Sequence, residues 1–333
     1  MSKVKVSIIG VTGYTGTELL RVLCQHPDVE IKHLVSRQYD NTPLEDVFPR
    51  MEQVSNGLVI NNTDPVKAAE DSDVVFLCLP HMASQGIVPQ IMGKAKIVDL
   101  SADFRLNDPK TFKTYYKDDH KCPELLEGKF IYGLPEIYRD HIKGADNVAN
   151  PGCFALLVQV LLYPFKNRMQ HAHVMAVSGT TGGGRSPRDP IDHPYCSQNM
   201  RSYLVNAHRH MPEIEHTLDL PHDDWNFLPS VGPFLRGIFA TAFIKSSHDP
   251  EDANFFYDQE PFVRPRREVN MTHVVSTNFV DVHYRAGEVG MVIAQGALDN
   301  LLKGASGTAV QNMNLMCGLD ENRGLQFSTP VYP

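Results

Sequence analysis

The start of the chain constrains the fold more strongly than any other stretch. Lys5 to Gly10 (KVSIIG) is a short apolar run that predicts a strand, and it leads directly into the glycine-rich stretch GVTGYTG. Thr17 to Gln25 (TELLRVLCQ) then repeats its apolar residues with a helical period. A strand, a glycine-rich loop and a helix in this order predict the opening unit of a parallel α/β sheet.

The rest of the first half continues the alternation. Val29 to Ser36, Ser72 to Pro80 and Lys96 to Ser101 are apolar or β-branched runs, each followed by polar loop residues. Strands separated by helical segments imply crossover connections and a parallel sheet that is buried on both faces. We therefore predict a Rossmann-type doubly wound domain.

The second half has a different pattern. Ala172 to Ser178, Gly237 to Lys245 and Val274 to Tyr284 read as longer, partly alternating strands, which predict an antiparallel or mixed sheet packed against helices. Gly304 to Gly318 predicts a helix that ends at Gly318. The expected fold class is thus α/β, with the Rossmann-type domain over residues 1–149 and an α+β domain over residues 150–303.

Composition excludes several classes of protein. A chain of 333 residues with 42% hydrophobic and 21% charged residues is globular and long enough for two domains. The net charge of −8 argues against a nucleic-acid partner, and no run approaches the roughly 20 apolar residues of a membrane span. The six scattered cysteines and the absence of a signal-peptide pattern predict a soluble cytoplasmic protein with reduced thiols. Neither His193-Pro-Tyr-Cys196 nor His216 to His222 has a zinc spacing, so no metal is expected.

The glycine-rich loop favours a nucleotide. Its spacing is GxxGxxG rather than GxGxxG, and the alternative is a tight turn without a ligand. Glycines let the backbone approach a pyrophosphate, which the N-terminus of the helix would attract. At the end of the second strand, Ser36 and Arg37 stand where an NAD enzyme would have a carboxylate, and this favours NADP unless Arg37 is only an exposed loop residue. The candidate cofactor-binding residues in the loop are Gly10, Thr12, Gly13, Tyr14, Thr15 and Gly16.

Cys153 is the strongest nucleophile candidate. Pro151 and Gly152 end the preceding strand, and the apolar run from Phe154 predicts a helix, so the thiol would lie at a helix N-terminus where its thiolate is stabilised. The alternative is a small buried thiol, as we expect for Cys24, Cys78 and Cys317.

A thiol enzyme also needs a group that carries protons. The run His208-Arg209-His210-Met-Pro-Glu213 provides two imidazoles and a carboxylate. We assign the base to His208 with Glu213 as its orienting carboxylate, and His210 remains the alternative.

Two further stretches suit anionic groups. Ser101 to Arg105 lies just past a strand of the first domain, where ligands collect in open parallel sheets. Ser178 to Arg185 (SGTTGGGR) follows a strand of the second domain, with glycines expected to expose backbone N–H groups. The alternative for each stretch is a plain loop without a ligand. The candidate substrate-binding residues are Ser101, Arg105, Asn150, Arg185 and His210.

In combination these stretches resemble the N-acetyl-gamma-glutamyl-phosphate reductases of arginine biosynthesis, which are related to the aspartate-semialdehyde dehydrogenases. The resemblance runs along essentially the whole chain and rests on GVTGYTGTELLRVL, LSADFR, NPGCF, SGTTGGGRSP, AHRHMPEIE, TNFVDV and DNLLKGASGTAVQNMNLMCGLDE. No single motif is decisive, but their order is specific.

The resemblance implies NADPH-dependent reduction of an acyl phosphate through a thioester on Cys153. It also implies that Arg105 holds the phosphoryl group and that residues 304–333 complete the first domain, with Asn312 near the nicotinamide. A homodimer or homotetramer would follow from the same resemblance.

This sequence departs from the family pattern in three places. Phe154-Ala155-Leu156 replaces the usual Tyr-Pro-Thr, Thr180 to Gly183 replaces Val-Ser-Gly-Ala, and Ala207 replaces glycine. These differences leave the acyl group of the substrate open, so an aminoadipyl-phosphate reductase of lysine biosynthesis is the alternative function. A non-enzymatic NADPH-binding sensor would not need Cys153, His208 and Arg105 together.

Overall fold

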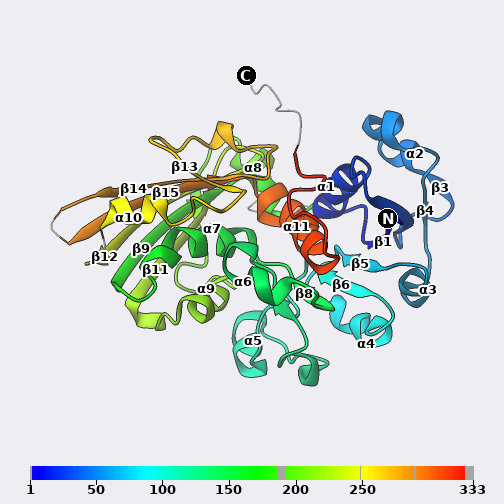
Figure 1. Ribbon diagram of the computed structural model, residues 1–333, viewed down its shortest axis with the longest axis horizontal. Helices are drawn as coiled ribbons and strands as arrows, with labels where there is room; N and C mark the ends of the chain where they lie inside the picture. The colour runs from blue at the N-terminus through cyan, green and yellow to red at the C-terminus, as the bar shows by residue number, and fades with distance from the viewer. Residues whose placement is uncertain (1, 186–192, 248, 289, 327–333) are drawn as a thin grey trace. The chain divides into compact units, whose positions relative to one another are not determined.

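The computed structural model describes residues 2–185, 193–247, 249–288 and 290–326. These residues form two compact units (Figure 1). The first unit consists of residues 2–151 and 305–326, and the second consists of the described residues between Gly152 and Gly304.

The first unit is built on an eight-stranded sheet in the order β3-β4-β2-β1-β5-β6-β8-β7. All of its strand pairs are parallel except β3 with β4. This confirms the predicted doubly wound sheet. The strands are β1 (Val4–Ile9), β2 (Val29–Val35), β3 (Thr42–Pro43), β4 (Val59–Asn61), β5 (Val74–Leu77), β6 (Lys96–Asp99), β7 (Ile131–Tyr132) and β8 (Asn147–Ala149).

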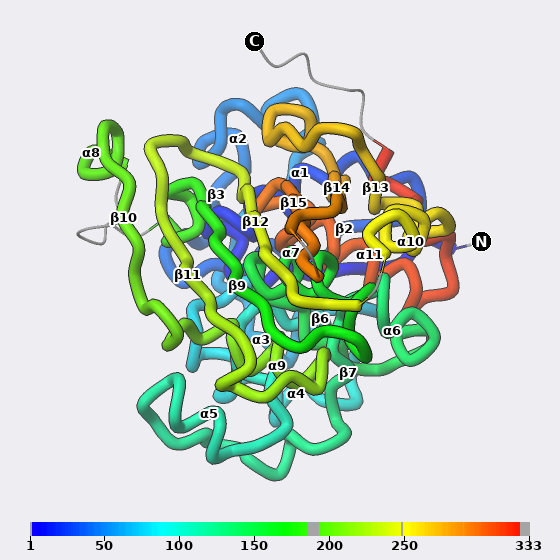
Figure 2. Tube along the Cα trace, turned by 90° about the vertical axis from the view of Figure 1, so that its left-hand side faces the viewer, coloured from blue at the N-terminus to red at the C-terminus, as the bar shows by residue number. Residues whose placement is uncertain are grey.

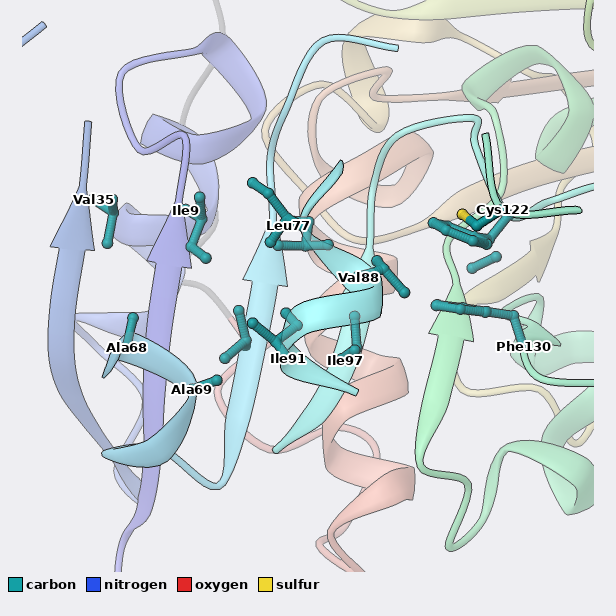
Figure 3. Close-up of a cluster of buried hydrophobic side chains, with 14 of the residues drawn as sticks. Ile9, Val35, Ala68, Ala69, Leu77, Val88, Ile91, Ile97, Cys122 and Phe130 are labelled. Carbon is teal, nitrogen blue, oxygen red and sulfur yellow. The ribbon is translucent and has the colours of Figure 1, made fainter. Parts of the chain in front are cut away.

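Apolar side chains fill the space between this sheet and its helices. Figure 3 shows Ile9, Leu77 and Ile97 on neighbouring strands, packed with Val88 and Ile91 of α4. The central strands are apolar on both faces because helices cover both of them. The helices of this unit are α1 (Tyr14–Leu23), α2 (Leu44–Val47), α3 (Pro65–Glu70), α4 (Val88–Ile91), α5 (Pro109–Tyr116), α6 (Pro135–Ile142) and α11 (Gly307–Met316).

The last helix, α11, belongs to the first unit although it follows the second unit in the chain. A π-helical turn at Leu302–Ser306 precedes it, and the hydroxyl of Ser306 donates to the backbone oxygen of Thr15 in α1. Gly318 follows the helix with a φ of 69°, which confirms the predicted glycine stop.

The second unit is built on a seven-stranded mixed sheet in the order β10-β11-β9-β12-β15-β14-β13 (Figures 1 and 2). The β9–β11 and β13–β14 pairs are parallel and the others are antiparallel. The strands are β9 (Met169–Ser178), β10 (Arg201–Ser202), β11 (Trp225–Val231), β12 (Ile238–Ser246), β13 (Val263–Pro265), β14 (Val280–Ala286) and β15 (Met291–Leu298).

One face of this sheet is packed and the other is open. A Cβ on Gly296 would lie 2.9 Å from a side-chain atom of Leu161, so this glycine lets helix α7 lie close against the packed face. On the opposite face, Met175 and Phe243 are 48% and 47% exposed. The helices of this unit are α7 (Cys153–Leu162), α8 (His193–Cys196), α9 (Met211–Leu218) and α10 (Pro250–Phe255).

One predicted strand is too long at its start. Val274 to Tyr284 was expected to be continuous, but β14 begins only at Val280. A short 3-10 helix at Met271–His273 precedes it, and Ser276 has a φ of 64° while its N–H donates to the carboxylate of Asp299. The apolar pattern continues through this turn because Val274 is buried against another part of the core.

Candidate active site

Cys153 is the first residue of α7. Its position at the helix N-terminus confirms the local prediction, since the first N–H groups of a helix have no intrahelical partner. The N-cap residue of the helix is Gly152, which has no side chain to cap the helix. The first turn carries no acidic residue. The thiol is half-buried, so it keeps access to a ligand.

Gly152, directly before the cysteine, brings together the groups from helix α9. A Cβ on Gly152 would lie 2.4 Å from Nε2 of His210, so the imidazole lies against the glycine backbone. The N–H of Gly152 donates to Oε2 of Glu213 over 3.0 Å. His210 and Glu213 are both buried. The structure thus brings this run next to the turn before the cysteine, and the bond from Gly152 shows that Glu213 fixes the turn that carries Cys153.

His208 has a different environment from His210. Its ring lies edge-on to Phe154, Tyr203 and Phe227, and its Nδ1 accepts the backbone N–H of His210 over 3.2 Å. Burial, and secondarily the charge of Arg209, lowers the pKa of His208 to about 3. A histidine with so low a pKa is neutral at pH 7 and is a weak base.

Other thiols lack the features of Cys153. Burial raises the pKa of Cys24, Cys122 and Cys317 to about 11, with charged groups adding smaller effects at the last two. Cys78 is buried and its pKa is raised still further. A thiolate is the reactive form, so these four side chains are inert at neutral pH.

The glycine-rich loop of the first unit has the shape that a pyrophosphate needs. Gly10 has a φ of 92°, and a Cβ on it would meet the backbone oxygen of Cys78 at 2.4 Å. A Cβ on Gly16 would meet the backbone oxygen of Gly10, also at 2.4 Å. A Cβ on Gly13 would meet no described atom closer than 3.7 Å, so packing within the chain does not require glycine there. The space above Gly13 is therefore open to a ligand at the N-terminus of α1.

The end of β2 presents a hydroxyl and a cation. Ser36 is buried, and its oxygen accepts the N–H of Gln38, while Arg37 is exposed. The nearest carboxylate in the sequence, Asp40, accepts the N–H of Asn62. This end of the strand suits a 2′-phosphate better than a ribose diol.

Asn312 on α11 contributes an unused acceptor. Its amide nitrogen donates to the backbone oxygen of Gly133 and to Oδ1 of Asn150, over 2.9 and 3.1 Å. Its Oδ1 is buried and finds no hydrogen-bond donor within the described part of the chain. A buried acceptor of this kind fits a ligand with an amide N–H, such as a carboxamide.

Three residues predicted to bind substrate make hydrogen bonds within the first unit. Ser101 is fully buried, and its hydroxyl donates to Asp99 and accepts the N–H of Asp103. Arg105 is buried, with Nε donating to the backbone oxygen of Asn150 over 2.8 Å. The amide nitrogen of Asn150 donates to the backbone oxygen of Ala305.

The glycine-rich loop after β9 does not expose its N–H groups, and that expectation is wrong. Gly179, Thr180 and Thr181 donate to backbone oxygens of Gly237, Phe234 and Leu235, and Gly182 and Gly184 donate within the loop. The glycines serve packing, because a Cβ on Gly179 would lie 2.6 Å from the backbone of Leu235. Arg185 at the end of the loop is exposed, and residues 186–192 lie outside the described residues.

The described residues offer neither a metal site nor a membrane span. No cluster of three or more His, Cys, Asp or Glu side chains there has the arrangement of a metal site. No helix there is long and apolar enough to span a membrane.

Comparison with known proteins places this chain in a family. It is 41% identical to the N-acetyl-gamma-glutamyl-phosphate reductase of Geobacter sp. (strain M21), over 99% of both chains. The reductases of Aquifex aeolicus and Methanopyrus kandleri are 38% and 37% identical, over 99% and 97% of this chain and 98% of each relative. The chain belongs to the N-acetyl-gamma-glutamyl-phosphate reductase family.

Family models and solved structures agree with this membership. The NAD binding domain of the semialdehyde dehydrogenases matches residues 5–145, and their dimerisation domain matches residues 153–300. The fold is that of aspartate semialdehyde dehydrogenase II from Vibrio cholerae, crystallised with ASA, with a TM-score of 0.73 at 15% identity over 96% of this chain and 99% of that one. The enzyme from Candida albicans, with NADP, has a TM-score of 0.70 at 14% identity, over 95% and 99% of the two chains.

The main departure from the reductase family pattern falls in the protein interior. Phe154, Ala155 and Leu156 are all buried in α7. They replace Tyr-Pro-Thr as packing residues, so this departure does not by itself indicate another substrate.

Sequence reasoning missed two residues near Cys153. Burial raises the pKa of Tyr203, and the neighbouring Cys153 adds to the shift. A Cβ on Gly304 would lie 2.9 Å from Cβ of Cys153, so this glycine lets the π-helical turn approach the cysteine. Tyr203 belongs to no motif, and Gly304 is the first residue of the predicted helix, where a glycine gives no signal of close packing.

Proposed function

We propose that this protein reduces N-acetyl-γ-glutamyl phosphate to N-acetylglutamate semialdehyde and phosphate, with NADPH as the reductant. The observation that carries the proposal is the arrangement around Gly152, where the imidazole of His210 lies against the glycine and Cys153 follows it as the first residue of α7. The chain is similar along nearly its whole length to N-acetyl-gamma-glutamyl-phosphate reductases, and this similarity supports the substrate.

His210, rather than His208, is the base in this proposal. Its Nε2 lies against the residue that precedes the nucleophile, whereas His208 is enclosed by aromatic rings and has a strongly lowered pKa. Glu213 is a positioning residue, because its bond to the N–H of Gly152 fixes the turn.

The first half of the reaction is acyl transfer to sulfur. His210 takes the thiol proton of Cys153, and the thiolate attacks the γ-acyl carbon. The carbon–oxygen bond to the phosphoryl group breaks, which leaves a thioester and releases inorganic phosphate. The N–H groups of the first turn of α7, which have no partner within the helix, stabilise charge on the thiolate and on the acyl oxygen.

The second half is reduction. The Gly10–Gly16 loop, Ser36 and Arg37 would hold NADPH, Asn312 Oδ1 would accept a hydrogen bond from its carboxamide, and the bound cofactor would supply the hydride that reduces the thioester. His210 returns its proton to the resulting oxyanion. Collapse of the thiohemiacetal then breaks the carbon–sulfur bond, releases the aldehyde and restores the cysteine. Arg105 and Arg185 are the candidate cations for the phosphoryl group.

The reverse reaction tests this function and its substrate. The enzyme is mixed with NADP⁺, inorganic phosphate and a semialdehyde, and NADPH formation is followed by absorbance. We expect the N-acetylglutamate semialdehyde to give the highest kcat/KM among the N-acetyl, N-succinyl and aminoadipate compounds. A preference for the aminoadipate compound would contradict the proposal and favour the lysine-pathway activity.

We also propose that the chain self-associates as a homodimer or homotetramer through the open sheet face that carries Met175 and Phe243. A second copy is the fitting partner because this region matches a dimerisation domain and the two side chains are large, apolar and about half exposed. The free cysteines suit a reducing compartment, and we assign the protein to the cytoplasm.

A further inference from the structure

Helix α11 is buried on every side and carries three amides that face different directions. All of its residues, from Gly307 to Met316, are buried, and none of them is charged. Gln311, Asn312 and Asn314 are fully buried, and successive residues point about 100° apart around a helix. Because the helix has no polar face to turn toward water, the hydrogen bonds of these amides fix its rotation within the first unit.

Asn312 directs its amide at the turn before α6. Its nitrogen donates to the backbone oxygen of Gly133 over 2.9 Å, and a Cβ on Gly133 would lie 2.5 Å from that nitrogen. Gly133 stands two residues before Pro135, the first residue of α6. The position of Asn312 Oδ1, the buried acceptor that finds no donor among the described residues, therefore depends on how α11 is held against α6.

A carboxylate that follows α11 in the chain ties these two helices together. Oε1 of Glu321 accepts Nε of Arg139 on α6 over 3.0 Å, and its Oε2 accepts Nη2 of the same guanidinium over 3.3 Å. Oε2 also accepts the amide nitrogen of Gln311 on α11 over 2.9 Å. Gln311 directly precedes Asn312, so this carboxylate holds α6 and α11 together beside the unused acceptor.

The geometry of this bridge makes it specific. The guanidinium of Arg139 donates to both oxygens of one carboxylate, and such paired, charge-assisted bonds are strong and directional. The side chains of Glu321 and Arg139 are only 17% and 25% exposed, so salt screens them less than a surface pair. Since both oxygens of Glu321 accept bonds from the chain, its effect on a ligand passes through Gln311 and α11.

We propose that Glu321 is a positioning residue for the nicotinamide end of NADPH. By holding α11 against α6, it keeps Oδ1 of Asn312 where the carboxamide N–H donates to it. This inference rests on the proposed function, which assigns that acceptor to the cofactor. The other end of NADPH is assigned to the Gly10–Gly16 loop, Ser36 and Arg37, whereas the bonds of Glu321 go to other residues, so its loss should affect the nicotinamide end alone.

Calorimetric titration of the full-length protein with two ligands tests this role. NADPH carries the nicotinamide, whereas 2′-phospho-ADP-ribose is the remainder of the cofactor without it. In Glu321→Ala, the Kd for NADPH should rise by roughly three- to tenfold, the effect of one weakened hydrogen bond. The Kd for 2′-phospho-ADP-ribose should stay at the wild-type value. A purely structural role of Glu321 would weaken the binding of both ligands together.

The matched control removes another ion pair of the segment after α11. Arg323 in this segment is paired with Asp28, and this pair includes neither Gln311 nor Arg139. Asp28→Ala should therefore leave both Kd values at the wild-type level. Circular dichroism checks that each variant is folded.

A second variant tests the path from the carboxylate to the helix. Gln311→Met keeps the size of the side chain and the pair between Arg139 and Glu321, but it removes the bond to α11. It should reproduce the loss that is specific to NADPH. Wild-type NADPH affinity in either Glu321→Ala or Gln311→Met, or an equal loss for both ligands, would overturn the proposal.

The wild-type protein shows separately whether the proposed function itself fails. A wild type that is active in the reverse assay, with normal NADPH binding in Glu321→Ala, would refute only the role of Glu321. A wild type that binds NADPH no more tightly than 2′-phospho-ADP-ribose would contradict the assignment of Asn312 to the carboxamide, and this inference would fall with it.

Discussion

At the scale of single residues, the structure separates two histidines that the sequence presents as equals. His208 and His210 share one motif and are both buried. Their difference depends on which ring lies against Gly152 and which is enclosed by Phe154 and Phe227, and these contacts come from residues far away in the chain. Residue types and spacing indicated that this run could supply a proton-carrying group. They did not indicate which of the two histidines lies against Gly152, because that depends on the fold.

The low pKa of His208 predicts a pH-dependent stability. Below pH 6.5 the unfolded chain protonates this residue, whereas the folded chain leaves it neutral down to about pH 3. The unfolded state then binds more protons, so the free energy of unfolding falls as the pH decreases, by about 1.4 kcal/mol per unit within this window. Between pH 7.5 and pH 5, the free energy of unfolding should therefore fall by roughly 2 kcal/mol less in His208→Gln than in the wild type.

Urea unfolding at the two pH values measures this difference. The control is His283→Gln, which changes a histidine outside the run His208–Glu213 and should behave like the wild type. An identical pH response in His208→Gln and the wild type would show that folding does not lower the pKa of His208.

Gly152→Ala tests the contact that carries the proposed function. The new Cβ would overlap Nε2 of His210, and displacing a catalytic group by about 1 Å costs roughly 10²-fold in rate. We expect kcat to fall by that order while NADPH binding is retained. Gly86→Ala, where a Cβ meets nothing within 4 Å, is the matched control. A kcat equal to that of the control would separate His210 from the chemistry.

At the scale of elements, the sequence predicted those with a strong local signal. The strand, loop and helix at the start of the chain were predicted because apolar period and glycine spacing agree there. Strands β11 and β15 were missed, since Pro229 interrupts one and Gln295 with Gly296 interrupts the other. Both are held by pairing with neighbouring strands, and local pattern does not show such pairing.

The glycines of the first loop should separate binding from stability. Gly16→Ala places a Cβ 2.4 Å from the backbone oxygen of Gly10, so we expect a loss of about 1–3 kcal/mol in unfolding free energy. Gly13→Ala meets no described atom closer than 3.7 Å and should fold normally, but it should weaken NADPH binding. Thermal unfolding and fluorescence titration with NADPH measure the two effects. Unchanged NADPH affinity in Gly13→Ala would remove the loop from the cofactor site.

At the scale of the whole molecule, the open sheet face predicts self-association. Phe243→Arg introduces a charge at the centre of the proposed interface and should lower the mass seen by light scattering. Phe255→Arg is the matched control, because Phe255 is 66% exposed on α10 and not on the sheet. Equal masses for wild type and Phe243→Arg would place the interface elsewhere.

The central claim is that Cys153 carries the acyl group. Intact-protein mass spectrometry after mixing the enzyme with N-acetyl-γ-glutamyl phosphate, without NADPH, tests it most directly. We predict a mass increase of one N-acetylglutamyl group that maps to Cys153, disappears on adding NADPH and is absent in Cys153→Ser. A Cys153→Ser enzyme that still reduces the acyl phosphate at the wild-type rate would contradict the account.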